Sequence, residues 1–109
     1  MKITKAWQIE EAIIMAKFLT WQQFMREWQK LTPQQRQLFA AAWRAINASL
    51  NAGRGLPPPP FVQKITDYDV YEVRWDANGR ATFHIDHTDS GEIMIVWRRI
   101  GDHKILKNP

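Results

Sequence analysis

Four consecutive prolines, Pro57–Pro60, divide this 109-residue chain into two parts of different character. Proline fixes φ and lacks a backbone N–H, so the run excludes a helix and favours an extended polyproline connector. A proline-rich recognition ligand is the alternative use of such a run. Apolar residues before the prolines recur at helical spacing, whereas the residues after them form short runs rich in β-branched and aromatic side chains. The sequence therefore predicts helices first and strands second.

Two helices are predicted before the prolines. The first covers 21–31, where apolar side chains recur on one side: Trp21, Phe24, Met25, Trp28 and Leu31. The second begins with Thr32 as N-cap, Pro33 at the first helical position and Gln35 completing a capping box, and it ends at Gly53. The short connection between them favours an antiparallel helix hairpin.

Three strands are predicted after the prolines, at 70–75, 80–86 and 92–100. Their short connections favour an antiparallel meander. A fourth strand is predicted at 13–18, before the first helix, and residues 1–11 are left open between a helical extension and a loose arm.

Side-chain alternation divides the meander into two faces. One is apolar and should pack on the helices; it carries Tyr71, Val73, Trp75, Ala81, Phe83, Ile85, Ile93, Ile95 and Trp97. The other, called the ionic face below, carries Glu72, Arg74, Arg80, Thr82, His84, Asp86, Met94, Val96 and Arg98. A three-residue loop at 77–79, with Gly79 in the left-handed region, keeps the faces separate and places Val73 opposite Phe83.

The composition fits one α+β domain with a core rich in aromatic residues. Six tryptophans each bury a large apolar area when packed. The chain has no cysteine, which excludes disulfides and thiolate chemistry and fits a reducing cytoplasm. No segment approaches the roughly 20 apolar residues of a membrane span. The net charge of +4 suits a polyanion or an acidic protein partner.

The arginines of the ionic face favour an anion site. Guanidinium groups bind phosphate oxygens bidentately and stay charged at any working pH. Arg74, Arg80 and His84 should share one patch, with Arg98 within reach from the neighbouring strand. The alternative is an ordinary solvated face whose charges compensate one another.

A metal site is the weaker interpretation of "HIDHTD". His84, Asp86, His87 and Asp89 lie close together in the sequence, but the two histidines point to opposite faces of a strand and the nearby arginines repel a cation. We therefore expect neither a metal nor another cofactor.

The order of a helix hairpin followed by a basic meander resembles the RelE/ParE superfamily of toxin–antitoxin toxins. The residues that carry the likeness are "NGRATF" and "VWRRIGDH", whose ending is similar to the GxH strand ending of RelE-like toxins such as the YafQ group. The resemblance implies a RelE-like fold, an N-terminal helix hairpin on a twisted antiparallel sheet. It covers 13–109 as the toxin domain and leaves 1–12 as an extension.

The resemblance also implies a function: ribosome-dependent cleavage of messenger RNA without metal, by attack of a ribose 2′-hydroxyl on the adjacent phosphate. Arg80 matches the arginine at the scissile phosphate, and His103 matches a basic or histidine position, where an imidazole suits acid/base work. Arg74 lies where a basic residue is usual, and His84 is a second candidate base. Further substrate contacts are expected from Lys64, Arg98, Arg99, Lys104 and Lys107.

The implied partners are a cognate antitoxin, in a toxin–antitoxin hetero-oligomer, and the ribosome with its mRNA; no membrane is involved. The sequence departs from the pattern at Asp102 and at Leu106 and Lys107, where a small polar and an aromatic residue are common. A ParE-like toxin that binds DNA gyrase without catalysis stays open, as does a non-toxic RNA- or protein-binding module on the same scaffold.

Overall fold

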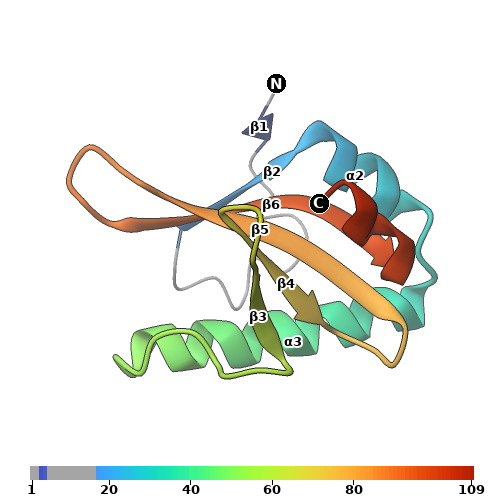
Figure 1. Ribbon diagram of the computed structural model, residues 1–109, viewed down its shortest axis with the longest axis horizontal. Coiled ribbons are helices and arrows are strands. Elements are labelled where there is room, and N and C mark those ends of the chain that lie inside the picture. The colour runs from blue at the N-terminus through green and yellow to red at the C-terminus, as the bar shows by residue number, and fades with distance from the viewer. Residues whose placement is uncertain (1–2, 5–16) are drawn as a thin grey trace.

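The computed structural model describes residues 3–4 and 17–109 (Figure 1). The predicted boundary between residues 12 and 13 lies outside this range, as does the start of the strand predicted at 13–18. The elements run in the order β1 (Ile3–Thr4), β2 (Lys17–Trp21), α2 (Gln22–Gln29), α3 (Pro33–Asn51), β3 (Val62–Ile65), β4 (Val70–Arg74), β5 (Gly79–His87), β6 (Ile93–Asp102) and the 3-10 helix η2 (His103–Lys107).

The strands form one sheet in the order β1-β2-β6-β5-β4-β3. The α+β architecture and the helix hairpin on one face are confirmed. The prediction of a purely antiparallel sheet is wrong at one place, because β2 runs parallel to β6, with Phe18 opposite Ile95. A parallel pair requires a long crossover, and here both helices and three strands lie between the two partners.

The helix signals in the sequence are confirmed for α3. Thr32 Oγ1 accepts from the Gln35 backbone N–H at 3.1 Å, and the Gln35 side chain accepts from Thr32 N at 2.8 Å. Past the C-terminal end, Gly53 takes a φ of +72°, which costs glycine little. By contrast, α2 begins at Gln22 after Trp21, without a side-chain cap. Neither helix, nor any other in the described residues, is long and apolar enough to cross a membrane.

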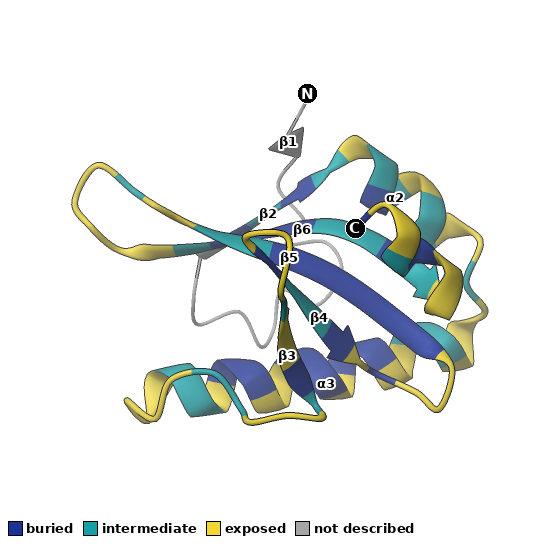
Figure 2. Cartoon of the chain, in the orientation of Figure 1, coloured by how far each residue is buried: buried dark blue, intermediate teal, exposed yellow. Residues whose placement is uncertain are grey.

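The core lies between the two helices and the apolar face of the sheet, and Trp97 occupies its centre. Its ring meets those of Phe39, Phe83 and Trp43 at centroid distances of 5.0, 5.2 and 5.6 Å. The apolar face follows the predicted alternation, except that Ile93 is 42% exposed. Figure 2 explains this exception, because the tip of the β5–β6 hairpin extends beyond the helices.

The predicted register of β4 against β5 is wrong by two residues. Val73 lies opposite Ala81 rather than Phe83. A shift of two leaves every side chain on its predicted face, which is why the faces are right although the register is not. Gly79 has no positive φ; a glycine is required there because a Cβ atom would lie 2.6 Å from the Trp75 ring.

Two features of the sheet were not anticipated. Strand β3 pairs with β4 at the edge, with Val62 opposite Val73. Between β5 and β6 the register shifts at Thr82/Phe83, so that Arg98 is the extra residue of a bulge. The bulge directs two successive arginines of β6 to different partners, Arg98 to His84 and Arg99 to Glu27.

Candidate functional site

The ionic face is the side of the sheet opposite the helices. The register aligns Arg74 with Arg80 across β4 and β5, and Arg80 with Gly101 across β5 and β6. One row therefore crosses three strands and ends two residues before His103. The structure thus aligns Arg74 with Arg80, two positions that the sequence assigned to one site, and places the end of β6 before His103 in the same row.

The side chain of Arg80 is buried and engaged within the protein. Its Nη1 donates to the backbone oxygens of Gly79 (2.9 Å), Asp76 and Ala77 (both 3.3 Å). Its Nε lies 3.4 Å from the Glu72 carboxylate, and 6% of the side chain is exposed. A phosphate reaches this guanidinium only if some of these contacts open, so its predicted role at the scissile phosphate requires a rearrangement.

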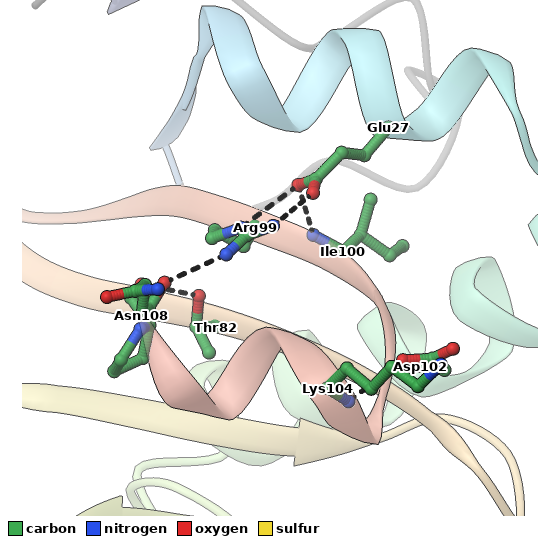
Figure 3. Close-up of polar contacts among 8 residues, drawn as sticks. Glu27, Thr82, Arg99, Ile100, Asp102, Lys104 and Asn108 are labelled. Carbon is green, nitrogen blue, oxygen red and sulfur yellow. Dashed lines mark hydrogen bonds and ion pairs between the residues drawn. The ribbon is translucent and has the colours of Figure 1, made fainter.

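Arg99 joins β6 to helix α2 (Figure 3). Its Nη2 lies 2.6 Å from Oε2 of Glu27, and Oε1 of the same carboxylate accepts from the Ile100 backbone N–H at 3.2 Å. The predicted substrate contact of Arg99 is thus in competition with a partly buried ion pair inside the protein. Glu27 was not singled out from the sequence, where it is one polar residue on an amphipathic helix.

Residues 103–109, called the C-terminal clasp below, fold back over the ionic face. The Pro109 backbone oxygen accepts from Thr82 Oγ1 at 3.0 Å and from Arg98 Nε at 3.1 Å. Arg99 Nη1 donates to the Asn108 oxygen at 3.1 Å (Figure 3). Within the clasp, the side chain of Ile105 is buried. The middle of the ionic face is therefore closed, and Thr82 has no exposed surface.

Beyond the clasp, His84 and Arg98 form a polar pair beside Trp21. Arg98 Nη1 lies 3.1 Å from His84 Nδ1, and the guanidinium carbon lies 3.8 Å from the centroid of the Trp21 ring. Arginine only donates, so Nδ1 must accept and the proton of the neutral imidazole sits on Nε2. Desolvation, with the positive charge of Arg98 as a second cause, lowers the pKa of His84.

This pairing changes the role that His84 can play. With Nδ1 occupied and Nε2 protonated, the imidazole has no free lone pair with which to accept a proton. The geometry therefore argues against His84 as the second candidate base and makes it a neutral hydrogen-bond donor. The sequence predicted that Arg98 lies within reach of His84, but it predicted Trp21 on the apolar side of the first helix.

A hollow of about 300 Å³ lies beside this pair, lined by Tyr68, Asp69, Val70, His84, Ile85 and Arg98. Two further hollows, of about 260 and 310 Å³, adjoin Lys30, Leu31, Gly101 and Asp102 at the other end of β6. Tyr68 was not singled out from the sequence, although an aromatic residue between two aspartates of a tight turn is a signal of exposure.

The remaining predicted site residues lie on the surface. Arg74, His103, Lys104 and Lys107 are exposed. Lys64 is also exposed and lies 3.5 Å from the Asp69 carboxylate, at the sheet edge formed by β3. His103 begins η2 directly after Asp102, whose carboxylate accepts from the Lys104 backbone N–H at 2.8 Å and so caps that turn.

The metal alternative finds no cluster in the described part of the chain. No group of three or more His, Cys, Asp or Glu side chains within residues 3–4 and 17–109 is placed to hold an ion. In the "HIDHTD" segment, the Asp86 carboxylate accepts from the His87 backbone N–H at 2.9 Å.

Comparison with known proteins shows a likeness of fold. No protein-family model matches the sequence, and no curated protein matches it significantly. The fold is similar to that of one chain in the crystal structure of a RelB–RelE antitoxin–toxin complex from Methanococcus jannaschii. The TM-score is 0.52 at 17% sequence identity, over 82% of this chain and 94% of that chain. The chain therefore shares its fold with a component of a toxin–antitoxin complex.

Proposed function

We propose that this protein is the toxin of a type II toxin–antitoxin system and acts as a ribosome-dependent mRNA endoribonuclease. The shared fold supports a toxin–antitoxin relationship. The observation that carries the nuclease assignment is the row that aligns Arg74, Arg80 and Gly101 across three strands and ends two residues before the exposed His103. Phosphodiester cleavage requires cations close to a group that can act as acid or base.

In this proposal the roles follow from exposure and chemistry. His103 transfers a proton to or from the reacting oxygens. Arg74, the exposed guanidinium of the row, offsets the charge that develops on the phosphate. Arg80 adds to this if its contact with Glu72 opens, and Lys104 and Lys107 lie in the same exposed turn as His103, where they attract the RNA backbone.

The test is cleavage of mRNA by the purified protein on translating ribosomes. We expect the fragments to carry a 2′,3′-cyclic phosphate and a 5′-hydroxyl, because the attacking group is the 2′-hydroxyl of the ribose itself rather than a metal-activated water. His103→Ala should slow cleavage by about 10² to 10⁴. His87→Ala is the matched control, since that imidazole is also exposed and lies at the far end of β5. If His103→Ala cleaves at the parent rate while His87→Ala is inactive, the site assignment is wrong and the metal interpretation must be reconsidered.

A toxin that binds DNA gyrase without catalysis is the second candidate. It is favoured by the internal engagement of Arg80 and Arg99, which leaves fewer cations on this face for a phosphate. The same preparation distinguishes the candidates: inhibition of gyrase supercoiling with intact mRNA would support the gyrase-binding toxin. If neither mRNA cleavage nor gyrase inhibition occurs, a non-toxic RNA- or protein-binding module on this scaffold is the better description.

A further inference from the structure

We propose that the hollow between the β3–β4 turn and the His84–Arg98 pair binds one nucleotide of single-stranded RNA, with the base stacked on Tyr68 and a phosphate oxygen accepting from Arg98 and His84. This inference rests on the proposed function, because it assigns a second contact to the RNA that the enzyme cleaves. It differs from the reaction site, which lies at the other end of β5.

Arg98 is fixed in place before any ligand arrives. Its Nε donates to the Pro109 oxygen, one Nη1 hydrogen is used by His84, and the guanidinium carbon lies 3.8 Å from the centroid of the Trp21 ring. A guanidinium has five N–H donors, so three remain for a ligand. Because the side chain is already immobilised, binding a phosphate costs little further conformational entropy.

His84 adds a directional donor to the same hollow. The accepting role of Nδ1 leaves Nε2–H as the free group of a neutral ring. A neutral donor beside a cation suits an anionic oxygen, and it does not repel the arginine. The pair is therefore organised for binding a phosphate oxygen rather than for proton transfer.

Tyr68 supplies the aromatic surface that an inorganic anion would not need. It is 49% exposed in the turn between β3 and β4, so its ring is accessible to a ligand. Val70 and Ile85 line the same hollow, whose volume of about 300 Å³ is at the lower end of small-ligand pockets. An exposed ring next to phosphate donors is the combination by which single-stranded RNA is bound.

The negative charge of Asp69 limits the ligand to one orientation. Its side chain is 96% exposed and lies 3.5 Å from Lys64 Nζ, which offsets part of the charge. A phosphate is favoured at the Arg98 end of the hollow and disfavoured at the Asp69 end, where the base should lie. The positive charge of Arg98 and the negative charge of Asp69 together orient one nucleotide across the hollow.

The distance from the reaction site follows from strand geometry. His84 lies four positions after Arg80 on β5, which corresponds to roughly 13 Å along the strand. The hollow therefore holds a nucleotide away from the scissile phosphate and helps to fix the path of the RNA. Its loss should weaken RNA binding without changing the chemical step.

The experiment measures binding of a fluorescein-labelled single-stranded RNA hexanucleotide to the full chain, without ribosomes, by fluorescence anisotropy. We expect Tyr68→Ala to weaken binding about 10-fold, whereas Tyr68→Phe should bind like the parent because it keeps the stacking ring. Arg98→Ala and His84→Ala should each weaken binding, and His87→Ala should not. Since Arg98 also holds the clasp, the fold of each variant is checked by thermal unfolding.

Three results would overturn the proposal. The first is a parent protein that does not bind the hexanucleotide, and the second is Tyr68→Ala binding as tightly as the parent. The third is 5′-AMP binding as tightly as the hexanucleotide, which would make a free nucleotide the ligand.

Failure of the subsite is distinguishable from failure of the nuclease proposal. If mRNA is cut with dependence on His103 while Tyr68→Ala binds RNA normally, the nuclease proposal stands and the subsite is wrong. If RNA binding depends on Tyr68 but no mRNA is cut, the subsite stands and the nuclease proposal fails.

Discussion

At the scale of single residues, the sequence predicts on which face of the sheet Arg80 lies, but it does not predict the contacts of its side chain. The strand alternation correctly placed it on the ionic face, next to Arg74. Its guanidinium is surrounded by the backbone oxygens of Asp76 and Ala77 in the turn 75–78, by the oxygen of Gly79 at the start of β5 and by the Glu72 carboxylate of β4. No spacing rule contains that information.

Replacing Arg80 tests whether its guanidinium stabilises the fold or is available to bind a phosphate. We expect Arg80→Met to lower the free energy of unfolding by about 2 to 3 kcal/mol, because it leaves the partly buried Glu72 carboxylate unpaired and removes donors from three backbone oxygens. Urea denaturation measures this change, and Arg74→Met on the exposed neighbour should change stability by less than about 0.5 kcal/mol. Equal stabilities for the parent and Arg80→Met would mean that the guanidinium is available for a phosphate.

His84 gives a pH-dependent prediction. Its pKa is lowered in the folded state by burial and by Arg98, so the unfolded chain binds the proton more tightly. Stability from this group is therefore complete above the ordinary value of 6.5 and is lost as the pH falls from there toward the lowered folded-state pKa. We expect the urea midpoint of the parent to fall between pH 7.5 and 5.5 by more than that of His84→Gln. Parallel pH profiles for the two proteins would contradict this account.

At the scale of elements, the features that the sequence predicted are those set by neighbours in the chain. The capping box of α3 involves residues three positions apart, and the two faces of β4 and β5 depend on alternation alone. The β4–β5 register depends on how the Trp75 ring packs over Gly79, and the parallel β2–β6 pair joins distant segments. Strand β3 was missed because Gln63 and Lys64, half of its four residues, are exposed and polar.

The cap of α3 is the element-level prediction. Thr32→Ala removes the acceptor for the Gln35 backbone N–H, and we expect a loss of about 1 kcal/mol in the free energy of unfolding. Gln34→Ala, an exposed substitution in the same first turn, should have little effect when it is measured in the same denaturation series. A Thr32→Ala protein as stable as Gln34→Ala would show that tertiary packing alone fixes the start of the helix.

At the scale of the whole molecule, the candidate site could be predicted in part. The sequence placed basic and imidazole groups on the sheet face away from the helices, and the structure brings Arg74, Arg80 and the segment before His103 into one row. The clasp that covers the middle of this face could not be predicted, because its contacts come from backbone oxygens of Asn108 and Pro109. Backbone acceptors have no sequence signature.

The whole-molecule prediction concerns an antitoxin. A chain with a net charge of +4 and an exposed guanidinium at Arg74 should bind an acidic or amphipathic segment that masks this part of the ionic face, together with the surroundings of Arg80. We expect the product of a neighbouring short gene to co-purify with the protein and to relieve growth inhibition when both are expressed. Arg74→Glu should weaken the complex. Harmless expression of the protein alone, with no co-purifying neighbour, would contradict the toxin assignment.

The parallel pairing of β2 with β6 has a consequence for how the protein is made. Synthesis proceeds from the N-terminus, so β2 cannot pair with its neighbour β6 until this last strand has been made. Trp97, around which the aromatic core is arranged, also arrives with that last strand. Contacts between such distant segments slow folding, because a large loop must close before it is stabilised. The sheet and its aromatic core therefore stay incomplete on the ribosome until β6 has emerged.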